Sequence, residues 1–307
     1  MKRFLSILIV LALVFSLAAC AAKKPAQPAE KLYALTHERE AVYLVGADGA
    51  EKVYDLPRSG MTADVSGSTL WYVEGDSLVR VGLADGSKTE YALPENAGVG
   101  PALVGAENEA YVMLASGEAD GFFTGAVYRV GANGAERVTS EYDWFENSTF
   151  AVDGSSVYYV DRENKLVRED ADGKKTEFDW PGFPVIFGLS VDGGRLYACW
   201  AAGCRSYDAV TGGGERIESG EEDETINIAV AHGGRLYYLV PSKDPTDSAQ
   251  LLKARRISDG KIVEYAKTAD VGFYTLGNVL TFGERGFVLD DGYQTDDFRY
   301  IPYDAGE

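Results

Sequence analysis

The chain of 307 residues is acidic and rich in glycine and tyrosine. It has 48 Asp and Glu against 29 Lys and Arg, a formal charge of −19, and 35 glycines and 19 tyrosines against 3 methionines. The absence of a basic segment argues against a nucleic-acid partner, and this composition favours β-structure over helices.

The first 19 residues have the three parts of a secretion signal. Lys2 and Arg3 supply the positive start, residues 4–15 are apolar, and small residues lead to Cys20. Such a stretch is too short to span a bilayer and remain there. Residues 17–20, Leu-Ala-Ala-Cys, resemble the lipobox of bacterial lipoproteins, which implies that Cys20 receives a diacylglyceryl group and becomes the mature N-terminus. The alternative is an ordinary signal peptide cut after an Ala-x-Ala-like site.

Residues 20–30 are predicted to form a flexible, lipidated tether, because Pro25 and Pro28 discourage regular structure. Two or more acyl chains hold a protein stably at a membrane, where one chain does not. The sequence therefore predicts a lipid-anchored protein on the extracytoplasmic side of the cell membrane.

Residues 31–307 repeat one pattern seven times. In each repeat a turn precedes a hydrophobic–aromatic pair, as in GRLYACW, GRLYYLV and SSVYYVD. The aligned aromatics are Tyr33, Trp71, Tyr111, Tyr158, Tyr197, Tyr237 and Phe287. Their spacing is about 40 residues, which is the length of one four-stranded propeller blade. Pairs such as Asp85-Gly86 and Asp172-Gly173 recur where a tight hairpin is expected between the third and fourth strands.

The strand count favours seven blades. With strands named A to D from the inner to the outer edge, the first repeat, residues 31–57, lacks A, and the last, residues 275–307, lacks D. Five complete repeats and two three-stranded ones leave two strands too many for six closed blades. The sequence therefore predicts an all-β fold, a single seven-bladed β-propeller whose terminal blades meet side by side. A six-bladed ring is the alternative.

This periodicity resembles the bacterial extracytoplasmic propellers with YVTN- or WD40-like repeats, and the receptor-related propeller domains of many lipoproteins. The sequence departs from conventional WD40 repeats, because it has no Gly-His…Trp-Asp signature. The resemblance implies binding or scaffolding more often than catalysis, and propellers host many functions.

One end of the ring is predicted to bind the ligand. In an up-and-down blade the A–B and C–D turns share one end, and the B–C and D–A connections share the other. The predicted long connections all belong to the second set: residues 115–125, 139–147, 179–185, 219–225, 241–250 and 291–297. Function concentrates on loops that a rigid scaffold holds. The candidate ligand-binding residues on them are Trp144, Trp180, Phe122, Phe123, Tyr142 and Tyr293.

Acidic residues accompany these aromatics, and the combination suits sugar rings, cationic groups or basic peptides. The alternative is that the aromatics fill gaps between blades and the acids are solvated. Residues 290–297 offer four carboxylates as calcium ligands, Asp290, Asp291, Asp296 and Asp297, with a solvated loop as the alternative. No other cofactor is predicted. Cys199 and Cys204 flank a four-residue hairpin loop, which predicts a disulfide, with two buried thiols as the alternative.

Catalytic motifs are missing from the sequence. The two histidines, His37 and His232, fall at opposite ends of the predicted ring, and no zinc spacing, nucleophile elbow or phosphate loop occurs. The first hypothesis is a lipoprotein that binds an envelope protein or glycan. The second is a propeller lyase or glycosidase, which requires two loop carboxylates converging on a pocket, one with a raised pKa. The third is a purely structural envelope protein.

Overall fold

The computed structural model describes residues 30–36, 38–95, 97–119, 122–143, 149–181, 186–200, 203–217, 226, 229–241, 249–268, 279–290 and 298–305. Cys20 and the predicted signal peptide lie outside the described residues. Residues 31–307 form one compact unit.

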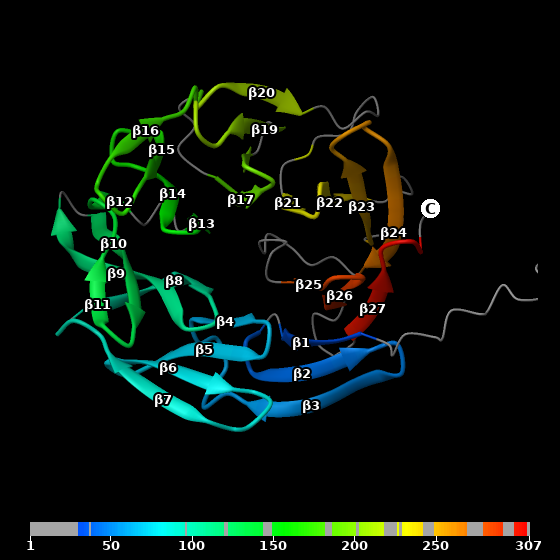
Figure 1. Ribbon diagram of the computed structural model, residues 1–307, viewed down its shortest axis with the longest axis horizontal. Coiled ribbons are helices and arrows are strands. Elements are labelled where there is room, and N and C mark those ends of the chain that lie inside the picture. Colours follow the sequence, from blue (N-terminus) through cyan, green and yellow to red (C-terminus); the bar gives the residue numbers. More distant parts are fainter. Residues whose placement is uncertain are drawn as a thin grey trace, which may run out of the picture. The chain divides into compact units, whose positions relative to one another are not determined.

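The described residues form seven antiparallel sheets, which are the blades of a ring (Figure 1). Blade 1 contains β1 (Lys31–Leu35), β2 (Ala41–Gly46) and β3 (Gly49–Asp55). Blade 2 contains β4 (Ala63–Ser66), β5 (Thr69–Glu74), β6 (Ser77–Gly82) and β7 (Lys88–Ala92). Blade 3 contains β8 (Gly98–Gly105), β9 (Glu109–Ala119), β10 (Phe122–Gly131), β11 (Gly134–Arg137) and β12 (Tyr142–Asp143). Blade 4 contains β13 (Ala151–Asp153), β14 (Ser156–Val160), β15 (Leu166–Glu169) and β16 (Lys175–Glu177).

Blade 5 contains β17 (Gly188–Asp192), β18 (Arg195–Trp200), β19 (Gly203–Asp208) and β20 (Gly214–Ile217). Blade 6 contains β21 (Ala229–His232), β22 (Arg235–Pro241), β23 (Gln250–Arg256) and β24 (Ile262–Thr268). Blade 7 contains β25 (Leu280–Phe282), β26 (Gly286–Asp290) and β27 (Phe298–Pro302). The prediction of a seven-bladed all-β propeller is confirmed, and the six-bladed alternative is wrong.

The ring closes where blade 7 meets blade 1. Both are three-stranded within the described residues, as the strand count predicts, and β27 contacts β2 and β3 (Figure 1). The contact is apolar: Val45 and Val288 are buried in it, and the rings of Tyr43 and Phe298 lie 5.0 Å apart. In the part of the chain that the structure describes, no strand is shared between the two sheets. Side-chain packing therefore joins the two terminal blades.

The aligned aromatics lie at the interfaces between blades. All of them except Tyr33 are buried on the second strand of their blade. Trp71 Nε1 donates a hydrogen bond to Ala106 O at 2.7 Å, and the Tyr111 hydroxyl donates to Gly154 O at 3.2 Å. Each of these bonds reaches the turn between the first two strands of the next blade. The repeat period therefore arises because each blade needs one large ring to pack against its neighbour.

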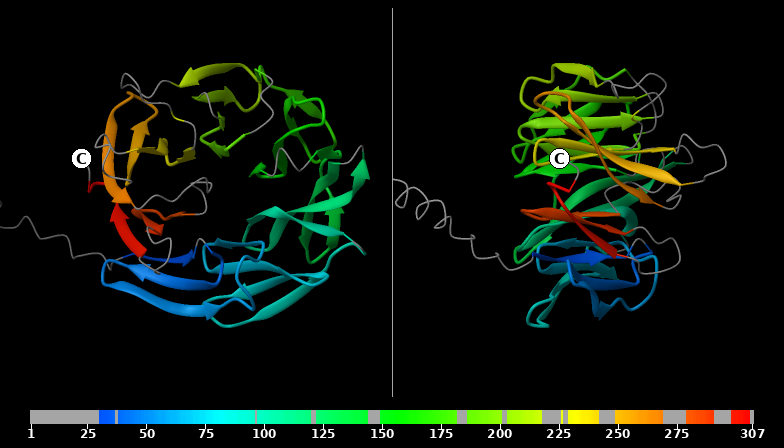
Figure 2. Two further views of the ribbon diagram at one scale, coloured as in Figure 1. Left: turned by 180° about the vertical axis from the view of Figure 1, so that it is seen from behind. Right: turned by 90° about the vertical axis from the view of Figure 1, so that its right-hand side faces the viewer.

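Backbone hydrogen bonds define the two ends of the ring. Leu83 N donates to Ser68 O, Ala209 N to Gly194 O, and Ile257 N to Gly234 O, at 2.8–3.0 Å. Each bond joins the C–D turn of a blade to the A–B turn of the same blade, so these turns share one end, which we call the turn end. The strands run from there to the opposite end, the loop end, where the B–C and D–A connections begin and finish (Figure 2).

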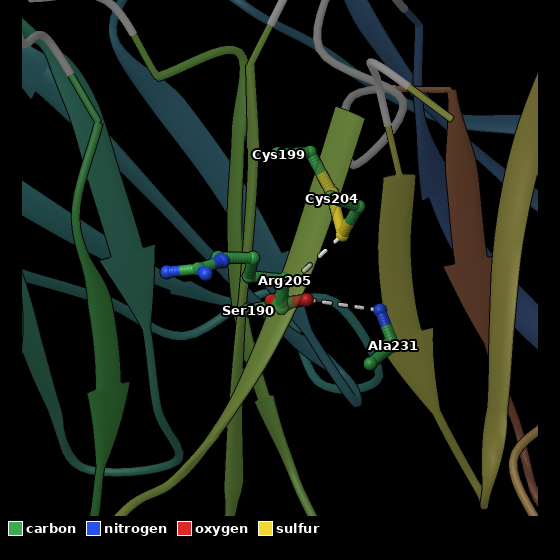
Figure 3. The surroundings of a disulfide bond; sticks show 5 residues. All are labelled: Ser190, Cys199, Cys204, Arg205 and Ala231. Atoms are coloured by element: carbon green, nitrogen blue, oxygen red, sulfur yellow. Dashed lines mark hydrogen bonds between the residues drawn. A yellow bond between two sulfur atoms is a disulfide. The ribbon is translucent and has the colours of Figure 1, made fainter. Parts of the chain in front are cut away.

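A disulfide bond lies in blade 5 near the loop end. Cys199 on β18 is the cross-strand partner of Cys204 on β19, and the structure joins their sulfur atoms. Both side chains are fully buried against blade 6. Below them Ser190 Oγ accepts a hydrogen bond from Ala231 N at 2.9 Å, which ties the innermost strands of blades 5 and 6 together (Figure 3).

Removing this disulfide is expected to lower the free energy of unfolding by about 2 kcal/mol, because the closed loop is short and its chain-entropy gain is small. Urea denaturation of the Cys199→Ser, Cys204→Ser double variant measures the loss. Alkylation of the unfolded wild-type chain without reductant should leave both residues unmodified. Alkylation of both thiols in that experiment would show that the bond is not formed.

Candidate functional site: the loop end

Trp180 and Trp200 lie together at the loop end. Trp180 follows β16 and Trp200 ends β18, and their rings make an edge-to-face contact with centroids 5.0 Å apart and planes at 78°. Trp200 is buried, whereas Trp180 is half-buried and also packs against the core between blades 4 and 5. Trp180 therefore fills part of the gap between blades 4 and 5, as the alternative interpretation predicts. It also exposes part of its ring at the loop end.

Three other candidate residues are brought together on blade 3. The sequence predicts a loop over residues 115–125, but β9 and β10 continue as a paired hairpin, with Phe122 opposite Ala119. The register shifts at a bulge between Thr124 and Gly125, and the two strands pair on both sides of it. The loop prediction is therefore wrong for this segment. Phe122 and Phe123 lie on β10, in a part of the chain whose backbone alone is described.

Strand β12 continues this arrangement. Tyr142 pairs with Gly125 on β10, two residues after Phe123, so the backbone places the three aromatic candidates within a few residues of one another at the loop end. Trp144 and Tyr293 lie outside the described residues. The loops that they belong to were predicted from the same pattern, and their roles stay predictions.

The candidate calcium site is described only at its first residue. Asp290 ends β26 and is buried, with 3% of its surface exposed. Asp291, Asp296 and Asp297 lie outside the described residues. Among the residues that the structure does describe, no group of three or more acidic, histidine or cysteine side chains is placed to hold a metal ion.

Sequence reasoning missed a charged pair, Arg39 and Asp64. Arg39, in the turn between β1 and β2, adopts a φ of 54°, a left-handed conformation that is uncommon for arginine. Its Nη1 lies 3.4 Å from both Met61 O and Pro101 O, so the guanidinium reaches across blades 2 and 3. Burial lowers the pKa of Arg39, and the charge of Asp64 opposes that shift. No repeat signal marks an arginine in a turn, so the pair is visible only in three dimensions.

Asp64 lies on β4, the innermost strand of blade 2. Burial raises the pKa of Asp64, and the hydrogen bond from Gly105 N at 2.7 Å and the charge of Arg39 offset part of that rise. The enzyme hypothesis requires a second carboxylate close to a carboxyl group whose pKa is raised. Within the described residues the charged partner of Asp64 is a guanidinium, and a guanidinium holds a carboxylate in place rather than sharing its proton.

The turn end is tied by short polar contacts. The Asp192 carboxylate accepts hydrogen bonds from Gly233 N at 3.1 Å and Gly234 N at 2.8 Å, which join the turns of blades 5 and 6. His232 stacks on Phe282 with ring centroids 4.4 Å apart, and burial lowers the pKa of His232. Its position at this end agrees with the sequence-based interpretation, whereas His37 lies outside the described residues.

Within the described part of the chain, no helix has the length and apolar character that crossing a membrane requires. No family model matches the chain, and a search of curated proteins finds no match. Solved structures do resemble it. An oligogalacturonate lyase in complex with manganese has a TM-score of 0.58 at 12% identity, over 89% of each chain.

A chain of the mitotic checkpoint complex has a TM-score of 0.51 at 9% identity, over 77% of this chain and 71% of that one. BamB from Moraxella catarrhalis has a TM-score of 0.46 at 12% identity, over 90% of this chain and 83% of its own. At identities this low, similarity to a solved structure supports the fold but not a function. The chain has the architecture of a seven-bladed β-propeller, a fold found in enzymes and non-enzymes alike.

Proposed function

We propose that this protein is a membrane-anchored, extracytoplasmic binding lipoprotein that recognises a protein or glycan through the loop end of its propeller. Cys20 carries the lipid, and residues 20–30 link it to the ring. The observation that carries the proposal is the asymmetry of the ring. The turn end consists of short turns bonded to one another, whereas the aromatic candidates gather at the loop end.

The described contacts suit recognition of a large ligand. The Trp180 ring is fixed by its edge contact with Trp200, so little side-chain entropy is lost when a ligand packs on it. Phe122, Phe123 and Tyr142 belong to paired strands, β10 and β12, whose backbones hydrogen-bond to their neighbours. Aromatic rings supported by rigid backbone are typical anchors of binding surfaces.

The Trp180→Ala substitution is expected to cost about 2 kcal/mol or more of binding free energy, roughly thirtyfold in affinity, because it removes a central anchor. The full-length chain, purified in detergent and immobilised, would capture its ligand from cell-envelope extract, and the affinity of the recovered ligand would then be measured.

Asp153→Ala is the matched control, since Asp153 is exposed at the turn end. Its affinity should equal that of the wild type. Melting temperatures of both variants separate a binding effect from loss of the fold, because Trp180 also contacts the core. Retained affinity in Trp180→Ala, together with lost affinity in Asp153→Ala, would show that the ligand binds at the turn end and not at the loop end.

A further inference from the structure

One position of the repeat is filled differently in blade 5. In the three preceding blades, the residue opposite the aligned aromatic on the third strand is an arginine: Arg80, Arg129 and Arg168. Arg80 donates to Glu107 O at 3.0 Å and Arg168 to Ala209 O at 3.1 Å, so each crosses to the next blade. In blade 5 the same position, opposite Tyr197, is Ser206. A long side chain that crosses to the next blade, as in blades 2 and 4, is therefore missing here, and the same position is Ala254 in blade 6.

A cavity of about 330 Å³ occupies that wedge, between blades 5 and 6 at the turn end. Blade 5 contributes Arg195, Ser206 and Glu215 to its lining, and blade 6 contributes Leu236, Arg255 and Ile257. This volume is within the range of pockets that bind small molecules, and the mixture of apolar wall and a few polar groups is typical of them.

The cavity gathers positive charge in a chain whose net charge is −19. Two arginines face it from blades 5 and 6, Arg195 and Arg255, against a single carboxylate, that of Glu215. Asp208 lies close to Arg195 as its strand partner, but its carboxylate accepts hydrogen bonds from Val210 N and Thr211 N within its own turn. Backbone N–H groups of this turn therefore stabilise part of the negative charge of Asp208, which leaves less of it to offset the arginines of the cavity.

The arrangement around Arg195 already contains a carboxylate. Arg195 Nη2 donates to Ser206 Oγ at 2.6 Å and to Glu215 Oε1 at 2.9 Å. The Glu215 side chain is 72% exposed, so its ion pair with Arg195 contributes little to stability and is readily exchanged. Glu215 thus occupies a position in which a carboxylate from solution could replace it.

We propose that this cavity binds a small organic carboxylate. The carboxylate displaces Glu215, lies between the guanidinium groups of Arg195 and Arg255, and packs its organic body against Leu236 and Ile257. Guanidinium groups favour carboxylates because their planar fork matches the two oxygens. This site is separate from the loop end, so it stands or falls independently of the proposed function.

Isothermal titration of the full-length chain in detergent tests the site with three probes: glucuronate, N-acetylalanine and inorganic phosphate. The first two distinguish a sugar acid from a peptide carboxyl terminus, and the third tests for an unselective anion site. We expect saturable binding of at least one carboxylate, with weaker binding of phosphate. Arg195→Ala and Arg255→Ala should each weaken it by about tenfold or more, since each removes a charged hydrogen-bond donor.

Two further variants give opposite results. Glu215→Gln should strengthen binding, because it removes the competing carboxylate, whereas Ser206→Arg should abolish binding by introducing the long side chain that crosses to the next blade in blades 2 and 4. The melting temperature of Ser206→Arg shows whether the fold persists. Arg129→Ala is the matched control, since Arg129 occupies the equivalent position in blade 3 and also pairs with a glutamate. No saturable carboxylate binding, equal affinity for phosphate, or an equal loss in Arg129→Ala would overturn the proposal.

Discussion

Replacing Trp71 with alanine is expected to lower the free energy of unfolding by about 3–5 kcal/mol. The side chain is fully buried between blades 2 and 3, where its ring stacks on Tyr91 at 5.8 Å and its Nε1 bonds to Ala106 O. Truncation removes the ring from the core, leaves a cavity that the two sheets cannot fill, and leaves the Ala106 carbonyl without this donor.

Urea denaturation measures this loss directly. Trp71→Phe keeps most of the packing and loses the hydrogen bond, so it should cost about 1–2 kcal/mol. Val210→Ala is the surface control, because Val210 is 71% exposed in the C–D turn of blade 5, and its effect should be within about 0.5 kcal/mol. If Trp71→Ala were as mild as Val210→Ala, the aligned aromatics would not be what joins one blade to the next.

Replacing Cys20 with serine is expected to abolish lipid attachment altogether. A serine hydroxyl does not replace the thiol that accepts the diacylglyceryl group, and without acyl chains the acidic ring has no affinity for an anionic bilayer. Metabolic labelling with palmitate, followed by membrane fractionation, measures both effects. The wild-type chain should carry the label and sediment with membranes, and the variant should carry none.

Cys199→Ser is the matched control for this experiment, because Cys199 lies in the ring, opposite Cys204. It should retain the label. A Cys20→Ser variant that stays labelled and membrane-bound would rule out acylation at Cys20.

The blade number could be predicted because its cause is local. Each repeat carries one aromatic residue at the position that packs against the next blade, and glycine-containing pairs that permit tight turns, such as Gly86 with φ 72° and Gly173 with φ 78°. Both signals are visible in a short window of sequence. Their period then fixes the number of blades without knowledge of any long-range contact.

The extended hairpin of blade 3 could not be predicted in the same way. Residues 115–125, ASGEADGFFTG, are rich in glycine and acidic residues and therefore have the composition of a loop. Pairing across the hairpin and with β12 determines their conformation. Tertiary contact overrides local propensity here.

The cavity between blades 5 and 6 could not be predicted from the sequence, because the arginine on the third strand of blade 5 stands one residue away from the aligned position. The third strand of blade 5 does contain an arginine, Arg205, but the register places Ser206 opposite the aligned aromatic. Neighbouring residues on a strand face opposite sides of the sheet, and Arg205 donates to Asp179 O on the side of blade 4. The strand register has to be known before the missing arginine can be recognised.

Site-specific photo-crosslinking in living cells tests most directly whether the loop end is the binding surface. A photoreactive residue would replace Pro181 or Pro241, both exposed near the loop end, or Asp85 or Asp172, both exposed in C–D turns of blades that do not border the cavity. We expect adducts with an envelope protein or glycan from the two loop-end positions and none from the turn-end positions. Adducts from Asp85 and Asp172 without any from Pro181 and Pro241 would contradict it.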